Sequence, residues 1–169
     1  EEYWPEKQGY DENHGGWKHG GPWNGGKYFS PYGNPRLSDG PEGEHLPARL
    51  ASETCRFIEA NQEKPFFAFL SFYSVHTPLL GRPDLVAKYE EKAAAISGVG
   101  FAPEEQVLPQ AKRPREVRIL QKHAVYAAMV EAMDEAVGMV LQKLESLGLE
   151  DDVIVCFTSD NGGLSTSAG

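Results

Sequence analysis

Two short runs of apolar residues stand out in the hydrophobic pattern of the chain. The first extends from Phe66 to Tyr73 and the second from Val153 to Phe157, and neither contains a charged residue. Uninterrupted runs of this length, rich in aromatic and β-branched residues, are typical of strands buried on both faces, as in parallel sheets. The pattern therefore predicts two central strands.

Apolar residues spaced three and four apart predict three helices. They cover residues 47–62, a short surface helix at 83–96, and a long helix from about Arg118 to Leu147. Pro47 suits a first helical turn, and Gly148 suits the left-handed cap that follows many helices. The stripe of the long helix that we expect to face the core consists of Tyr126, Met129, Val130, Met133, Val137, Val140, Leu141 and Leu144.

The order helix, strand, helix, long helix, strand predicts an α/β fold with a mostly parallel sheet flanked by helices. Residues 97–117 contain Pro, Gly and charged residues and are expected to form a connection. We predict that residues 1–169 are part of one domain. In that domain, residues 1–47 form an irregular region and residues 48–169 contribute the α/β core.

The irregular region has an unusual composition. It holds ten of the eighteen glycines and six of the twelve prolines, with aromatic residues interleaved among them. So many aromatic residues are rare in linkers, which favours a segment packed over a scaffold. Long loops of this kind inside compact domains usually carry function.

Composition narrows the classes of partner. With 40% hydrophobic and 24% charged residues the chain is typical of globular proteins, and its net charge of −9 argues against nucleic acid or an anionic membrane surface as default partners. No apolar run is long enough to span a membrane. Cys55 and Cys156 have neither zinc-ligand nor disulfide-framework spacing, and we predict both to be buried. The sequence leaves the oligomeric state open.

Polar residues follow each predicted strand. His76 comes shortly after the first, and Asp160 and Asn161 follow the second. Open α/β sheets bind ligands at the carboxyl ends of their strands, and neighbouring carboxylate and amide oxygens suit Ca²⁺ or Mg²⁺. An ordinary Asx turn and a structural histidine are the competing interpretations. The functional interpretation requires that the two loops converge on a common cavity.

The irregular region contains a second group of candidates, in the stretch HGGWKHGG. His14 and His19 could ligate a metal, but the stretch offers no third ligand, and surface or packing histidines are commoner. Lys18 or His19 as a contact to an anionic substrate is the alternative that we prefer.

Four stretches together resemble the arylsulfatase family of the alkaline-phosphatase-like superfamily. They are YWPEKQGYDENHGG, KPFFAFLSFYSVHTP, YAAMVEAMDEAVGMVLQKLESLGLEDD and VIVCFTSDNGG, and they follow the order and spacing of the family. The Asp-Asn-Gly-Gly ending is the most specific of them, because related phosphatases usually carry Asp-His-Gly there. The resemblance implies the sulfatase-like α/β fold and hydrolysis of sulfate esters.

The resemblance also implies roles for individual residues. Asp160 and Asn161 match two oxygen ligands of a Ca²⁺ ion (Mg²⁺ is possible), and His76 matches the histidine that contacts the sulfate and assists the leaving oxygen. His19 and Lys18 match the family only weakly, as substrate contacts. The implied substrate is a sulfated carbohydrate or an aryl sulfate, and we favour a sulfated glycan because the aromatic opening loop suits stacking on sugar rings.

The chain departs from the family at its nucleophile. Sulfatases convert the cysteine of a Cys-x-Pro-x-Arg stretch to formylglycine, and neither Cys55 nor Cys156 has that context. We therefore expect an internal fragment of a sulfatase whose nucleophile and remaining metal ligands lie outside this chain. By itself it should be inactive and bind Ca²⁺ feebly. The family resemblance implies a periplasmic, extracellular or lysosomal location.

Two rival functions remain open. A phosphodiesterase or phosphonate hydrolase of the same superfamily could use the same residues, because the pocket and the nucleophile choose the reaction. A non-catalytic binding protein on a sulfatase-like scaffold is the rival from a different class.

Overall fold

A computed structural model of the chain describes residues 3–19, 21–22, 27–105 and 114–163. Its elements, in chain order, are η1 (Pro5–Lys7), α1 (Leu46–Asn61), α2 (Pro83–Ala94), β1 (Phe101–Pro103), β2 (Glu116–Arg118) and α3 (Ala124–Ser146). The three predicted helices are thus confirmed, and α1 lies within one residue of its predicted range. No helix in the described part of the chain is both long enough and apolar enough to cross a bilayer.

The helix ends follow from local sequence. Proline occupies the first turn of both α1 and α2, where its missing N–H costs nothing. Gly148, with φ of +66°, follows α3 as predicted, and its N–H donates to Glu145 O over 2.9 Å. The N–H of Leu149 donates to Leu144 O over 2.9 Å. These two bonds form a Schellman motif, which satisfies carbonyls at the end of the helix and turns the chain back along it.

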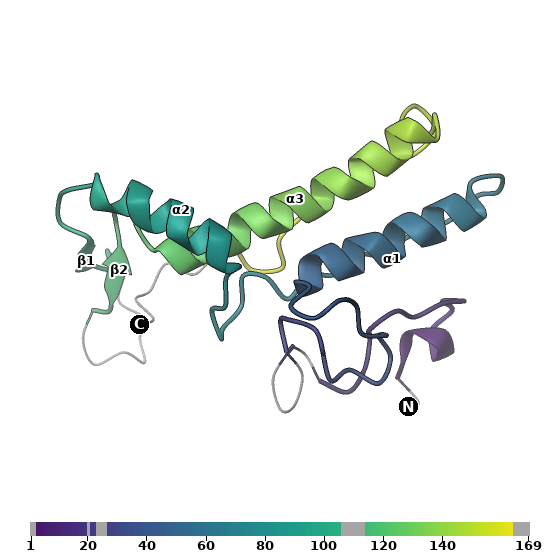
Figure 1. Ribbon diagram of the computed structural model, residues 1–169, viewed down its shortest axis with the longest axis horizontal. Helices are drawn as coiled ribbons and strands as arrows, with labels where there is room; N and C mark the ends of the chain where they lie inside the picture. Colours follow the sequence, from purple (N-terminus) through teal and green to yellow (C-terminus); the bar gives the residue numbers. More distant parts are fainter. Residues whose placement is uncertain (1–2, 20, 23–26, 106–113, 164–169) are drawn as a thin grey trace.

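Helix α3 packs between α1 and α2 (Figure 1). Its Met129 is buried with residues of α1 and of the irregular region, and its Ala128 and Ala132 are buried against Leu85 of α2. The predicted stripe of α3 was partly wrong, because Val130 and Leu141 are exposed. The side of α3 that carries Ala128 and Ala132 is buried instead, because small side chains allow the neighbouring helices to approach closely.

Residues of the irregular region form part of the core, which the sequence assigned to residues 48–169 alone. Tyr28 and Tyr32 are each only 1% exposed and pack in one cluster with Leu46 and Leu50 of α1 and Met129 of α3. The tyrosines fill space that neither helix fills alone. This region is therefore a fixed cover on the helix pair.

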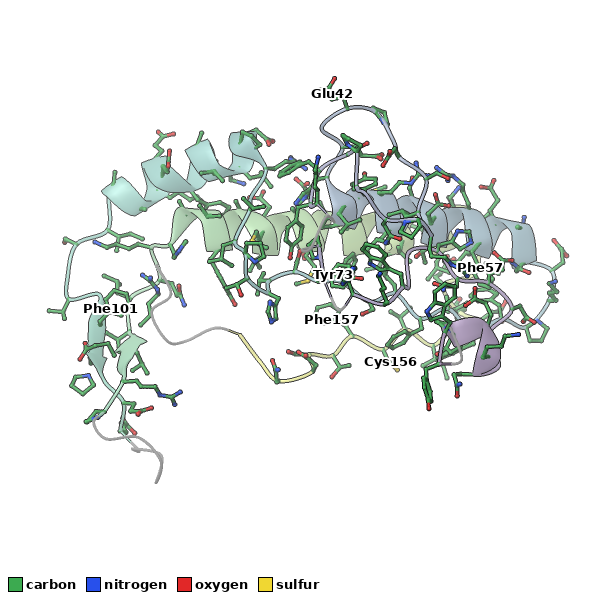
Figure 2. The ribbon with its side chains drawn as sticks, turned by 90° about the horizontal axis from the view of Figure 1, so that it is seen from below. Glu42, Phe57, Tyr73, Phe101, Cys156 and Phe157 are labelled. Carbon is green, nitrogen blue, oxygen red and sulfur yellow. The ribbon has the colours of Figure 1, made fainter. Side chains whose placement is uncertain are left out.

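The two predicted buried strands are not strands in the described residues. Residues 66–73 and 153–157 are extended but pair with no other described segment, and most of their side chains are exposed, including Phe69 at 72% and Ile154 at 91%. Cys156, predicted to be buried, is exposed as well, and Cys55 is half-buried. A strand needs a hydrogen-bonded neighbour, and the described chain offers neither segment one. Figure 2 shows Tyr73, Cys156 and Phe157 together on one side of the helices.

The described residues form a single small sheet, which the sequence did not predict. Strands β1 and β2 pair antiparallel, with Ala102 opposite Val117, inside the range expected to be a connection. Arg115 donates from Nε and Nη2 to Glu104 Oε2 over 3.0 and 2.9 Å next to the pairing. Because β2 occupies residues 116–118, α3 begins at Ala124 and not near Arg118. The mostly parallel sheet expected from the sequence is absent from the described residues.

Replacing Gly81 by Ala should destabilise the packing of α2 on α3. A Cβ at Gly81 would lie 2.9 Å from Val86 Cγ2, 3.0 Å from Ala128 Cβ and 3.3 Å from Val125 O. Overpacking of this kind costs about 1–3 kcal/mol. Gly138→Ala is the matched control, because a Cβ there meets no atom within 4 Å and alanine favours a helix interior by about 1 kcal/mol. Thermal unfolding should show a lower melting temperature for Gly81→Ala and a higher one for Gly138→Ala. Equal shifts in the two variants would contradict the prediction.

The stability of the fold should fall in acid because of His45. This imidazole is 4% exposed, stacks on Phe29 with ring centroids 4.9 Å apart, and leaves Nε2 without a hydrogen-bond partner among the described residues. Burial, aided by the positive charge of Arg82, lowers the pKa of His45 from 6.5 to about 4. Below about pH 6.5 the unfolded chain binds a proton that the folded chain does not. The free energy of unfolding should therefore decrease by up to about 3 kcal/mol as the pH falls towards 4.

This contribution can be isolated by comparing denaturant unfolding of the wild type and His45→Gln at several pH values. The difference in unfolding free energy between them should change across pH 4–6.5, whatever their difference at neutral pH. The exposed His14→Gln serves as the control. A constant difference between wild type and His45→Gln would contradict the prediction.

Candidate functional site

The loop after residues 66–73 presents His76 at the surface. The N–H of His76 donates to Tyr73 O over 2.8 Å, and the buried hydroxyl of Tyr28 donates to His76 O over 3.3 Å. Burial raises the pKa of Tyr28 to about 12, so this hydroxyl remains a donor at neutral pH. The backbone at His76 is thus attached to the core of the irregular region, while its side chain is exposed to solvent.

The imidazole of His76 has a defined proton arrangement. Its Nδ1 lies 2.7 Å from Thr77 O, and a carbonyl oxygen can only accept, so Nδ1 carries a proton. In the neutral ring Nε2 is then a hydrogen-bond acceptor, and it becomes a donor only in the imidazolium form.

The loop after residues 153–157 is a tight turn held by its own polar atoms. Asp160 Oδ1 accepts from the N–H of Asn161 over 2.8 Å, and Ser159 Oγ accepts from the N–H of Gly162 over 2.9 Å. Gly162 has φ of +83°, a conformation that side chains disfavour. Both Asp160 and Asn161 are exposed. These hydrogen bonds do not form an Asx turn, in which Asp160 would accept from the N–H of Gly162, and they leave the carboxylate accessible.

The turn carries two hard-oxygen side chains. The amide nitrogen of Asn161 is placed to donate to Asp160 Oδ1 over 3.1 Å and to Gly162 O over 3.3 Å, which leaves the amide oxygen turned away from these acceptors. The exposed carboxylate of Asp160 and the amide oxygen of Asn161 are donors of the kind that Ca²⁺ binds, at about 2.3–2.6 Å. The donor chemistry of the turn therefore fits Ca²⁺, although it supplies fewer than the six to eight ligands that Ca²⁺ takes.

Both loops lie at the same end of α3. Gly81, five residues after His76, lies against Val125 and Ala128, and Gly163, two residues after Asn161, lies against the hydroxyl of Tyr126. Tyr73 and Phe157, which precede the two loops, also lie on one side of the helix layer (Figure 2). This arrangement follows from the chain reversal after α3. It brings residues that flank the two loops, Gly81 and Gly163, to the first turns of α3.

The other predicted site residues lie in residues 14–19 of the irregular region. The ring of His19 meets the edge of Trp17 with centroids 4.4 Å apart, and Lys18 is exposed. His14 contacts Glu12 at 3.1 Å and Glu53 at 3.7 Å. Within the described residues no three His, Cys, Asp or Glu side chains gather as a metal site would require. A substrate contact by Lys18 or His19 stays a prediction.

Sequence reasoning missed two tyrosines beside these loops. Tyr28 holds the backbone at His76, and Tyr126 packs against Gly163. Both were visible only as aromatic positions, Tyr28 in the irregular region and Tyr126 on a helix stripe. No local signal separates such positioning roles from ordinary core packing, because the contacts join residues distant in sequence.

Comparisons with known proteins agree on a family. The profile of the family described as Sulfatase matches residues 2–168. Steryl-sulfatase of Homo sapiens is 31% identical over 119 residues, which cover 70% of this chain and 15% of that protein. An ulvan-active sulfatase of Formosa agariphila is 30% identical over 132 residues, which cover 74% of this chain and 24% of that protein. The chain spans about a fifth of the length of the curated relatives that it matches.

A solved structure extends the likeness to the fold. The crystal structure of Ps i-CgsB in complex with k-i-k-neocarrahexaose matches 88% of this chain and 31% of that chain, with a TM-score of 0.56 and 22% identity. The extended segments and helices described above thus have the arrangement of a larger, previously solved fold.

Proposed function

Because the chain belongs to the sulfatase family, we propose that a longer protein containing it hydrolyses sulfate esters. The observation that carries the proposal is the pair of loops flanking one end of α3, one with an exposed imidazole and one with an exposed carboxylate beside an amide. Sulfate-ester cleavage needs a group that gathers the anionic oxygens and a group that handles the proton of the leaving oxygen. The loop with Asp160 and Asn161 offers the first group, and the loop with His76 offers the second.

In this proposal Asp160 and Asn161 hold a Ca²⁺ ion with ligands from outside this chain. When bound, the ion supplies positive charge that offsets the charge of the sulfate oxygens. Asp160 contributes a carboxylate, and Asn161 contributes an amide oxygen without adding a second charge. Gly162 and Gly163 keep the turn narrow, so that a ligand can approach the backbone closely.

His76 manages the proton in this proposal. With Nδ1–H donating to Thr77 O, Nε2 is the ring nitrogen that would exchange a proton with an ester oxygen. The imidazolium would donate from Nε2 to the bridging oxygen as its bond to sulfur breaks. The nucleophile, which the family makes as formylglycine, comes from outside this chain, since no Cys-x-Pro-x-Arg stretch occurs in the sequence.

We propose a sulfated carbohydrate as the substrate, in preference to a small aryl sulfate. Support comes from the aromatic residues of the irregular region, which suit stacking on sugar rings, and from the likeness to an ulvan-active enzyme. The likeness to steryl-sulfatase keeps a compact hydrophobic ester as the competing substrate. A periplasmic, extracellular or lysosomal location is part of the proposal and rests on the family resemblance.

Initial rates on three esters test the reaction class. The purified longer protein, with Ca²⁺ present, should hydrolyse 4-nitrophenyl sulfate faster than 4-nitrophenyl phosphate and bis(4-nitrophenyl) phosphate, and chelation of the metal should stop it. A preference for the diester would indicate a phosphodiesterase. Absence of turnover on all three would support the non-catalytic scaffold.

A further inference from the structure

A cavity of about 390 Å³ lies between the carboxyl-terminal half of α2 and the first turns of α3. Its volume is within the range of small-molecule sites. The side chains that matter for its chemistry are Tyr89 and Lys92 of α2, Lys122 and His123 before α3, and Tyr126 of α3. No Asp or Glu is among its lining residues within the described chain. The protein as a whole has a net charge of −9, whereas the charged residues that line this cavity are positive.

The wall of the cavity is mainly apolar and aromatic, and its charged groups are Lys92 and Lys122. Lys92 Nζ lies 5.2 Å from the centroid of the Tyr89 ring. The carboxylate of Glu131, which forms an ion pair with Lys88, lies near enough to Lys92 for this lysine to help lower the pKa of Glu131. His123 Nδ1 accepts from the N–H of Tyr126 over 3.2 Å. That bond places the proton of the neutral ring on Nε2, which makes Nε2 a donor. The cavity thus combines mainly apolar and aromatic surfaces with two lysines and one N–H donor.

This cavity adjoins the proposed site through one residue. Tyr126 lines the cavity, and its hydroxyl is also the atom nearest to Gly163, where a Cβ would lie 2.7 Å from it. Gly163 ends the turn that begins with Asp160 and Asn161. A ligand long enough to extend past Tyr126 could therefore contact both places.

We propose that this cavity is a subsite for an anionic sugar unit next to the one that carries the scissile sulfate. Sugar rings present C–H faces that pack on tyrosine rings, and their sulfate groups accept hydrogen bonds from ammonium and imidazole N–H groups. The inference rests on the proposed function, since it assigns a second sugar unit to the same substrate. It makes the enzyme selective for oligosaccharides over isolated esters.

Calorimetry on the longer protein tests the subsite. The probe is a sulfated carrageenan hexasaccharide, titrated into the wild type, into the double variant Lys92→Ala/Lys122→Ala, and into the control Lys7→Ala/Lys64→Ala. The control removes the same charge from exposed lysines that do not line the cavity. We expect Kd to rise at least tenfold in the first variant, which corresponds to about 1.4 kcal/mol, and to stay within twofold in the control.

Turnover of 4-nitrophenyl sulfate separates this inference from the proposed function. This ester has no second sugar, so its kcat and KM should be the same in all three proteins. Equal hexasaccharide affinity in the cavity variant and the control, or no measurable binding to the wild type, would overturn the subsite even if the ester is hydrolysed. Absence of ester hydrolysis in the wild type would overturn the proposed function. A loss of hexasaccharide binding that is confined to the cavity variant would still locate the sugar site.

Discussion

Replacing Asp160 by Ala in the longer protein should lower kcat for 4-nitrophenyl sulfate by about a thousandfold or more. The substitution removes one carboxylate from a site whose role is to hold positive charge against the sulfate, and such electrostatic contributions are among the largest in catalysis. The fold should be little affected, because Asp160 is exposed and, among described contacts, its Oδ1 accepts only from the backbone and side-chain N–H groups of the adjacent Asn161. Steady-state rates at saturating substrate, with circular dichroism for the fold, make the measurement.

Two controls make the result specific. Asp152→Ala removes an exposed aspartate from the start of the same segment, far along the chain from the turn, and should keep the wild-type rate. Asp160→Asn keeps the size and one oxygen but loses the charge, so it should need a higher Ca²⁺ concentration for any activity it retains. Wild-type turnover by Asp160→Ala in excess Ca²⁺ would remove Asp160 from the metal site.

The helices were predictable because their signals are local. The proline in the first turn of α1 and Gly148 after α3 act within a few residues of where they stand. The stripe of α3 failed at Val130 and Leu141 for the opposite reason. Which side of a helix is buried depends on its neighbours, and here α1 and α2 cover the alanine side.

The two strands were predicted from uninterrupted apolar runs, but neither segment pairs with another in the described chain. Residues 66–73 and 153–157 are extended and apolar, as expected of buried strands, yet they remain unpaired and largely exposed. Pairing is a relation between segments, and sequence pattern describes one segment at a time. The β1–β2 hairpin was missed because three-residue strands carry too little pattern to recognise.

The candidate site shows the same division. Positions of His76, Asp160 and Asn161 after apolar runs could be identified from sequence, and their chemistry stays a prediction. The proton on Nδ1 of His76 and the supporting hydroxyl of Tyr28 could not, because they depend on single distances between atoms. The cavity beside Tyr126 likewise joins residues 89–96 with residues 121–130. Only the packing of α2 on α3 brings these two ranges together.

Replacing His76 by Gln should slow the hydrolysis of sulfate esters to an extent that depends on the leaving group. Glutamine can still donate a hydrogen bond to Thr77 O, but it cannot carry the additional proton that the imidazolium would donate. General acid catalysis typically contributes a factor of about 10²–10⁴. The loss should be large for sugar sulfates, whose alkoxide leaving groups need protonation, and small for 4-nitrophenyl sulfate, whose phenolate is already stable.

The measurement is kcat/KM for a series of sulfate esters with leaving groups of increasing pKa, in the wild type, His76→Gln and the control His14→Gln. His14 is an exposed histidine that contacts Glu12 and lies in the irregular region, so its replacement should leave every rate unchanged. The wild-type rates should depend weakly on leaving-group pKa and the His76→Gln rates steeply, because only the wild type can neutralise the developing charge on the departing oxygen. A uniform loss across the series would assign His76 to sulfate binding and remove it from proton transfer.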